Sequence, residues 1–150
     1  RRQLQSEFIK LSKQMKKTTV FITHDLDEAV RVGHRIAIMR DGMVVQIGTP
    51  EEIVINPADE YVADFVKGIS RLKVVQAKTI MQSLKDYENK FGLLDDDNEI
   101  VNENDVLSKL IETSISKDKP IIVLGKNNQK LGVISQSDLL KAVIEGSENE

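Results

Sequence analysis

The chain of 150 residues contains no cysteine and no tryptophan, and aromatic residues make up only 4% of it. Without cysteine, the chain can form neither disulfide bonds nor thiolate zinc sites. With so few aromatic rings, it offers little of the stacking surface that holds unpaired bases. The formal net charge of −3 gives no support for nucleic-acid binding either.

Long apolar runs are also missing. No stretch approaches the roughly 20 apolar residues that a membrane-spanning helix needs, and the basic first 17 residues lack the apolar part of a secretory signal. Those residues instead predict an amphipathic helix, because Leu4, Phe8, Leu11 and Met15 recur at helical spacing. Hydrophobic residues at 40% and charged residues at 30% are typical of a globular protein with one domain or two small ones. Because the chain begins with Arg1 rather than Met, we expect it to be a fragment of a longer protein.

A polar turn follows an apolar run in the stretch TTVFITHDLDEAV. The residues Val20–Ile22, flanked by threonines, predict a strand that is buried on both faces, as in a parallel sheet. Asp25 is a suitable N-cap for the next helix, Glu28 would complete a capping box, and Gly33 is a suitable residue to end that helix. The strand would carry His24 to a site at its carboxyl end, although a histidine in this position can also simply cap a turn.

The next segment, RIAIMRDGMVVQIGTPEEI, contains two local signals. Asp41-Gly42 between two apolar runs is a strong signal for a tight β-hairpin. Thr49, Pro50 and Glu52 then have the spacing of a helix start, with a capping box and a proline at the first helical position. The stretch ADEYVADFV predicts one more helix before residue 70.

The composition changes near residues 67–72. The stretch LKVVQAKTIM predicts a strand followed by the start of a helix. The stretch DDDNEIVNEND holds six acidic residues among eleven and predicts a solvated loop. After it, a helical stripe, a hairpin formed by PIIVLG and KLGVIS, and a final helix in SDLLKAVIEG predict a βαββα order.

Up to about residue 68, the chain closely resembles the end of the nucleotide-binding subunit of ATP-binding-cassette (ABC) importers, in particular those of the glycine betaine/proline (quaternary amine) uptake family. The resemblance rests on the T-H-D-x-x-E-A turn, the R-I-A-I-M strand, the D-G hairpin and the G-T-P-E-E-I helix start, which occur in this order. It implies that residues 1–70 are the C-terminal part of a RecA-like α/β nucleotide-binding domain. It also identifies His24 as the switch histidine of the H-loop, which hydrogen-bonds near the γ-phosphate and the attacking water in phosphoryl transfer.

The parts of this family that bind ATP and Mg²⁺ have no counterpart in the sequence. It contains no G-x-x-x-x-G-K-[ST] motif, no family signature and no apolar strand ending in Asp-Glu. We therefore expect no ATP hydrolysis by this chain, and a catalytic role for His24 only in a longer parent protein. The resemblance implies a parent that uses ATP and Mg²⁺, associates with transmembrane permease subunits, and lies at the cytoplasmic face of the cell membrane. Its function would be the uptake of an osmoprotectant.

Residues 71–150 resemble a single cystathionine-β-synthase (CBS) module. The stretches AKTIM, IV…ENDVLSKL and PIIVLGKNNQKLGVISQSDLLKAV follow the order of that module, and G-V-I-S-Q-S-D is the most specific part. In ligand-binding members, the positions that match Ser135 and Asp138 hold ribose and phosphate. If two chains pair, Ile122 and Ile134 would line a cavity between their sheets together with Ser135 and Asp138. The resemblance suggests an adenine nucleotide or cyclic di-AMP as the ligand. Alternatively, Ser135 simply caps the last helix, with Asp138 in its first turn.

One CBS module alone buries little core. We therefore expect two chains to form a homodimer through the helices predicted at Asp105–Ile115 and Ser137–Ile144. The module would then regulate transport by sensing a nucleotide or, through the acidic loop, the ionic strength. A free-standing CBS-type regulator that senses adenine nucleotides and a pure dimerisation module are the alternatives. The sequence as a whole thus predicts an α/β nucleotide-binding tail followed by an α+β CBS module.

No metal site is expected. His24, Asp25, Glu28 and His34 do not have the spacing of a standard zinc site. The run Asp95–Asp97 lacks the glycine and the alternate spacing of a calcium loop.

Overall fold

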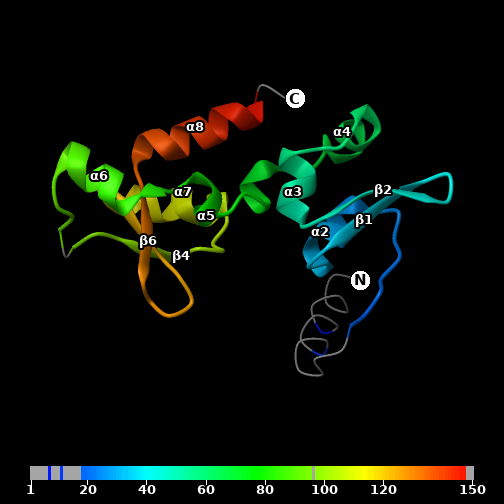
Figure 1. The fold of residues 1–150 in the computed structure, drawn as a ribbon, viewed down its shortest axis with the longest axis horizontal. Coiled ribbons are helices and arrows are strands. Elements are labelled where there is room, and N and C mark those ends of the chain that lie inside the picture. Colours follow the sequence, from blue (N-terminus) through cyan, green and yellow to red (C-terminus); the bar gives the residue numbers. More distant parts are fainter. Residues whose placement is uncertain (1–6, 8–10, 12–17, 96, 148–150) are drawn as a thin grey trace. The chain divides into compact units, whose positions relative to one another are not determined.

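A computed structural model describes residues 7, 11, 18–95 and 97–147 of the chain, and its fold is mixed α/β, as the sequence predicts (Figure 1). The chain divides into two compact units, of which the first ends at Ile69 and the second begins at Ser70. The amphipathic helix predicted over residues 1–17 lies outside the described residues, apart from Glu7 and Leu11, which are helical and exposed. None of the described helices combines the length and the apolar character that crossing a membrane requires.

Unit one consists of a short helix, a β-hairpin and two further helices. In chain order these are α2 (Leu26–Val32), β1 (Ile36–Arg40), β2 (Met43–Gly48), α3 (Pro50–Ile55) and α4 (Glu60–Val66). One face of the hairpin packs against the helices, because the alternating residues Ile36 and Ile38 are buried. The core around them contains Ile53, Val62 and Val66, with Leu26, Ala29, Val30, Val45, Val54 and Tyr61 packed against it.

The tight hairpin predicted at Asp41-Gly42 is confirmed. β1 and β2 are antiparallel, and Arg40 lies opposite Met43 at the turn. Asp41 and Gly42 both have positive φ angles, of 53° and 78°. Two-residue turns between twisted strands favour these angles, which aspartate tolerates and glycine adopts without strain.

Both predicted helix starts of unit one are present, but one is built differently. Thr49 Oγ1 accepts from the N–H of Glu52 at 3.2 Å, and the Glu52 carboxylate accepts from the N–H of Thr49 at 2.8 Å, so the predicted capping box of α3 is confirmed. Asp25 likewise caps α2, because it accepts from the N–H of Glu28 at 3.2 Å. The N–H of Asp25, however, donates to Thr23 Oγ1, so the second half of the capping box predicted there is wrong.

The buried parallel strand predicted at Val20–Ile22 is not present. The segment forms no strand, and Val20, Phe21 and Ile22 are 84%, 48% and 91% exposed. A parallel strand needs hydrogen-bonding neighbours from distant parts of a chain, and helices over both of its faces. In the described part of unit one, the two-stranded sheet of β1 and β2 does not include this segment. The apolar run is therefore exposed, directly before the turn that carries His24.

Unit two contains a four-stranded mixed sheet with several helices. Its elements are η1 (Arg71–Lys73), α5 (Ala77–Ile80), β3 (Gln82–Ser83), α6 (Leu84–Phe91), β4 (Ile100–Asn102), α7 (Leu107–Ser116), β5 (Ile121–Leu124), β6 (Lys130–Ile134) and α8 (Gln136–Ser147). The strand order is β3-β6-β5-β4. β4 runs parallel to β5 and is connected to it through α7, whereas the other pairs are antiparallel. From α7 to α8 the elements follow the predicted order of a helix, a hairpin and a final helix, and the strand that precedes them, β4, lies in a stretch predicted to be a loop.

Two predictions for unit two are wrong. The strand predicted in LKVVQAKTIM is absent and η1 ends there instead, although Val74 and Val75 are buried as strand residues would be; the helix start predicted after it is present as α5. The acidic stretch DDDNEIVNEND is not one solvated loop, because β4 lies inside it and Val101 is only 2% exposed. The acidic residues around this short strand favour a loop when the sequence is considered locally. The strand forms because it pairs with β5, which lies beyond α7 in the chain.

Candidate functional site

His24, the residue predicted to be catalytic, lies in a short turn before α2, and its side chain is exposed. Hydrogen bonds fix the turn on both sides of it. The N–H of Asp25 donates to Thr23 Oγ1 at 3.0 Å, and the hydroxyl of Thr23 donates to Glu28 Oε2 at 2.9 Å. The imidazole is therefore accessible to a ligand, on a turn whose backbone is held by buried and half-buried side chains.

An open cavity of about 350 Å³ borders this turn. Its walls come from the turn with the start of α2 and from the end of α4 with the residues that follow it, and they are formed by His24, Asp25, Leu26, Asp27, Phe65, Gly68 and Ile69. The volume is at the small end of the range of small-molecule sites. The lining combines one imidazole and two carboxyl groups with an apolar wall, so His24 can contact a polar group that enters the cavity.

Ser135 and Asp138 lie at the start of α8 and are hydrogen-bonded to each other. Asp138 Oδ2 accepts from the N–H of Ser135 at 2.8 Å and from its hydroxyl at 2.6 Å, and Ser135 Oγ accepts from the N–H of Asp138 at 3.3 Å. This is the helix-capping arrangement that the sequence permits as the alternative to ligand binding. A further donor, Gln82 Nε2, reaches the same carboxylate oxygen at 2.7 Å. No local signal pointed to Gln82, because only the pairing of β3 with β6 brings it to this position.

Ile122 and Ile134, which were predicted to line one cavity, lie on opposite faces of the sheet. In the antiparallel pairing of β5 with β6, Ile121 is opposite Ile134 and Ile122 is opposite Val133, and opposed residues point to the same face. Ile122 and Ile134 are also buried, at 4% and 0% exposure. Three of the four predicted ligand residues thus lie together at the end of β6 and the start of α8, and Ile122 is separated from them by the sheet.

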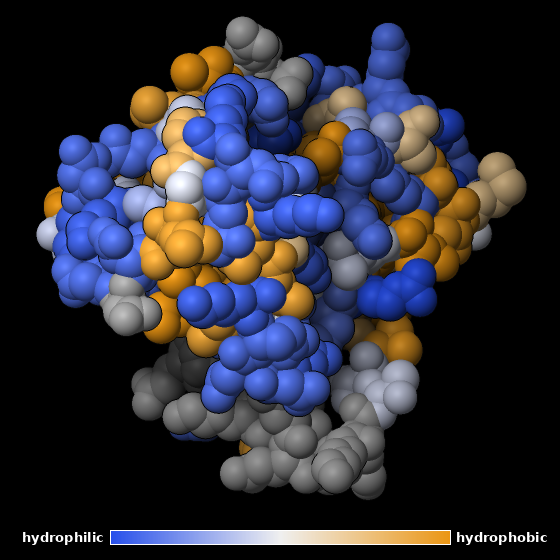
Figure 2. Space-filling view, turned by 60° about the vertical axis from the view of Figure 1, so that its left-hand side comes forward, coloured by the Kyte–Doolittle hydropathy of each residue, from blue (hydrophilic) through white to orange (hydrophobic). Residues whose placement is uncertain are grey.

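The helices predicted to pair two chains have apolar residues on their exposed surfaces. α7 exposes Ile115 at 79%, and α8 exposes Leu140, Val143 and Ile144 at 62%, 39% and 54%. Figure 2 shows that hydrophobic side chains interrupt the hydrophilic surface of the molecule in several places. Apolar surface of this kind is common at sites of protein association. The homodimer itself stays a prediction.

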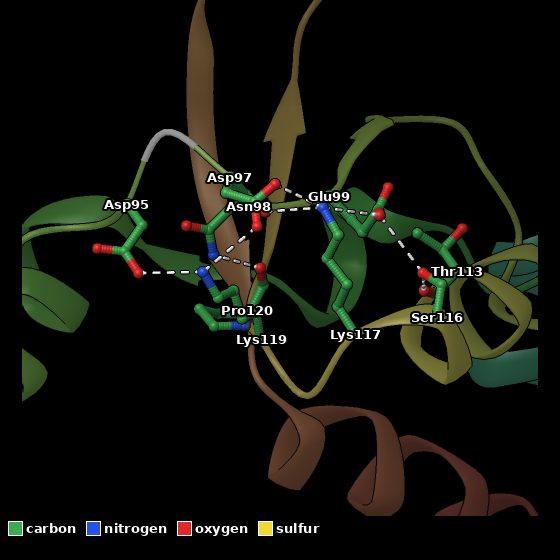
Figure 3. A network of polar contacts seen from close by, with 9 residues as sticks. All are labelled: Asp95, Asp97, Asn98, Glu99, Thr113, Ser116, Lys117, Lys119 and Pro120. Atoms are coloured by element: carbon green, nitrogen blue, oxygen red, sulfur yellow. Dashed lines mark hydrogen bonds and ion pairs between the residues drawn. The ribbon is translucent and has the colours of Figure 1, made fainter.

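Ion pairs tie the acidic stretch before β4 to the segment between α7 and β5 (Figure 3). Lys117 Nζ lies 2.7 Å from Asp97 Oδ1 and 3.6 Å from Glu99 Oε1. Lys119 Nζ lies 3.3 Å from Asp95 Oδ2. The hydrogen bond between Lys117 and Asp97 lowers the pKa of the carboxyl group and raises the pKa of the amine. Across the part of the chain that the structure describes, no group of three or more His, Asp or Glu side chains is arranged to hold a metal ion.

No protein-family model matches the chain. The chain is similar to the trimethylamine N-oxide transport system ATP-binding protein of Pelagibacter ubique, with 37% identity over 148 aligned residues that cover 95% of this chain and 40% of that protein. It is 39% identical to the glycine betaine/carnitine transport ATP-binding protein of Listeria monocytogenes, over 97% of this chain and 34% of that protein. It is 40% identical to the glycine betaine transport ATP-binding protein of Bacillus subtilis, over 95% of this chain and 31% of that protein.

Among solved structures, a CBS domain-containing protein of Bacillus anthracis covers 80% of this chain and 75% of its own length, at 14% sequence identity and a TM-score of 0.31. A likeness at this level carries no conclusion about the fold. The relatives matched by sequence are much longer, and the chain spans only 31–40% of their length. The chain is therefore homologous to the C-terminal part of ATP-binding subunits of ABC transporters for glycine betaine and related quaternary amines.

Proposed function

We propose that the chain is part of the ATP-binding subunit of an ABC importer for osmoprotectants of the glycine betaine and proline type. The observation that carries this proposal is the identity of 37–40% along 95–97% of the chain to ATP-binding proteins named for the transport of trimethylamine N-oxide, glycine betaine and carnitine. These matches extend over both units of the chain, which favours a subunit that contains both over a free-standing CBS-type regulator.

In the complete subunit, His24 has the role of the switch histidine. Its exposure beside an open cavity supports this assignment, and a neutral imidazole offers one donor and one acceptor nitrogen. A hydrogen bond from the ring to a γ-phosphate oxygen would stabilise the charge that develops in phosphoryl transfer. ATP supplies the phosphoryl group and Mg²⁺ neutralises its charge, and we assign their binding to other parts of the subunit.

Unit two, in the same proposal, is a CBS module that pairs with a second copy through α7 and α8 and regulates transport. The exposed Ile115, Leu140 and Ile144 support this pairing. Ser135 and Asp138 have the chemistry to bind the hydroxyl and phosphate groups of an adenine nucleotide or cyclic di-AMP. Because Asp138 Oδ2 already accepts three hydrogen bonds, a ligand hydroxyl would bind the other oxygen or replace one of these donors. The complex would also contain transmembrane permease subunits at whose cytoplasmic side this subunit lies.

Uptake by the full-length subunit, reconstituted with its permease in lipid vesicles, tests the transport function. We expect ATP-dependent accumulation of labelled glycine betaine or proline, and loss of accumulation in the His24→Ala variant. If neither a quaternary amine nor proline accumulates while the complex still hydrolyses ATP, the proposed substrate class is wrong.

Calorimetry on the full-length subunit tests the regulatory part separately. Binding of cyclic di-AMP or an adenine nucleotide should be weakened by Asp138→Ala and unaffected by His24→Ala. If the Asp138→Ala variant binds these compounds as tightly as the wild type does, unit two serves for dimerisation or for sensing ionic strength instead.

A further inference from the structure

Glu28 is a buried acidic residue, only 7% exposed, in the unit that carries the exposed His24. An ionised group is unfavourable in the interior unless hydrogen bonds compensate for the lost water, so the contacts of Glu28 indicate its role. We infer that Glu28, acting through the hydroxyl of Thr23, is a positioning residue that holds the backbone on both sides of His24 and thereby directs the imidazole. This inference rests on the proposed role of His24 in phosphoryl transfer.

The contacts form a closed ring of hydrogen bonds around His24. The hydroxyl of Thr23 donates to Glu28 Oε2 at 2.9 Å, and the same Oγ1 accepts from the N–H of Asp25 at 3.0 Å. Asp25 in turn accepts the N–H of Glu28 on Oδ1 at 3.2 Å and the N–H of Ala29 on its carbonyl oxygen at 3.1 Å. Thr23 and Asp25 are the two chain neighbours of His24, so the backbone on each side of the histidine is tied to the first turn of α2.

Helix capping alone does not account for this arrangement. Asp25 already caps α2 with its own side chain and needs no carboxylate from Glu28 for that purpose. In an ordinary capping box, the Glu28 carboxylate would return to the N–H of Asp25. Here it extends past that group to a side chain on the other side of His24. Thr23 suits this position because a hydroxyl can donate and accept at once, and a hydrogen bond that is partly shielded from water is stronger than one at the open surface.

The test is ATP hydrolysis by the full-length subunit in its transporter. Thr23→Val keeps the shape of the side chain and removes the hydroxyl, so kcat should fall about 10- to 100-fold, the loss that a misplaced catalytic group causes, with little change in the KM for ATP. Glu28→Ala should act in the same way. Thr23→Ser and Glu28→Gln keep the required donor and acceptor and should retain most of the activity. Thr19→Val, at an exposed threonine outside the ring, is the matched control.

Combining the same substitutions with His24→Ala distinguishes a positioning role from an unspecific loss of structure. Thr23→Val should cause no further loss there, because a residue that acts only through His24 has nothing left to position. The inference is overturned if the two losses multiply, or if Thr23→Val hydrolyses ATP at the wild-type rate while His24→Ala does not. If His24→Ala itself retains normal hydrolysis, the proposed role of His24 fails, and the inference fails with it. If Glu28→Ala does not fold, the comparison of Thr23→Val with Thr23→Ser decides alone, since these two variants distinguish the hydroxyl from the methyl group.

Discussion

Gln82 Nε2 donates to Asp138 Oδ2 at 2.7 Å, which joins two residues 56 positions apart in the chain. Gln82 is part of β3, an edge strand of the sheet in unit two, and Asp138 is in the first turn of α8. Ser135 contributes two more donors to the same oxygen. The carboxylate of Asp138 therefore caps the start of α8 and links it to β3.

Asp138→Ala should lower the free energy of unfolding of unit two by about 1–2 kcal/mol, the usual effect of losing a helix cap with its hydrogen bonds. Chemical denaturation of the wild type and the variant measures this difference. Lys141→Ala, at an exposed position of the same helix, is the control and should stay within about 0.5 kcal/mol of the wild type. Equal stability of the wild type and Asp138→Ala would show that the hydrogen bonds to Oδ2 do not hold α8 in place.

Gly42 and Gly68 form a matched pair for testing the hairpin turn. A Cβ atom at either position would meet no atom within 4 Å, but only Gly42 has a positive φ, of 78°. Gly42→Ala should therefore destabilise unit one by roughly 1–2 kcal/mol, because alanine is strained in the left-handed region. Gly68→Ala should be neutral or slightly stabilising, since it only restricts the unfolded chain. Thermal unfolding of both variants checks this prediction, which the same midpoint for Gly42→Ala and Gly68→Ala would contradict.

The ion pair between Asp97 and Lys117 should stabilise the folded state only over a limited pH range. The hydrogen bond from Lys117 lowers the pKa of Asp97. The contribution of Asp97 to the stability of the folded state is therefore present above the unfolded pKa of about 4. It is lost as the pH falls through the lower pKa of the folded state. The hydrogen bond to Asp97 raises the pKa of Lys117. That contribution is complete below the unfolded pKa of about 10.4 and is lost as the pH rises through the higher folded pKa.

Unfolding midpoints of the wild type and Lys117→Met, measured across this pH range, test the ion pair. The difference between the two proteins should be largest near neutral pH and should shrink at both ends of the range. Added salt should also reduce it, because the charges are at the surface and are screened. Lys126→Met, at an exposed lysine between β5 and β6, should show no such pH dependence. A difference that is constant from acid to alkaline pH would point to packing of the Lys117 side chain instead of its charge.

The structural features predicted correctly from the sequence are those that depend on near neighbours. The turn at Asp41-Gly42 and the capping box between Thr49 and Glu52 are each specified by residues at most three positions apart. Strands depend instead on partners that are distant in the chain. Val20–Ile22 has the residue types of a buried strand but no strand partner among the described residues. β4 has acidic neighbours that suggest a loop, yet its pairing with β5 buries Val101.

The candidate sites show the same difference between local and distant contacts. The T-H-D pattern singles out His24, but a threonine and a glutamate five positions apart, such as Thr23 and Glu28, have no standard meaning until the turn between them is folded. Ile122 and Ile134 were predicted to line one cavity on the strength of the CBS resemblance, not of any pattern within the two strands. The register of β5 against β6, which puts them on opposite faces, is not visible in either strand alone.

The decisive measurement is ATP hydrolysis by the full-length subunit in its transporter, with and without the His24→Ala substitution, at saturating ATP and Mg²⁺. If His24 is the switch histidine, the substitution should lower kcat by about 10²–10⁴-fold, as expected for a side chain that assists proton positioning, while ATP still binds. His34→Ala, at the other exposed histidine, should leave turnover unchanged. A His24→Ala subunit that hydrolyses ATP at the wild-type rate would contradict this account and leave His24 with no role beyond capping a turn.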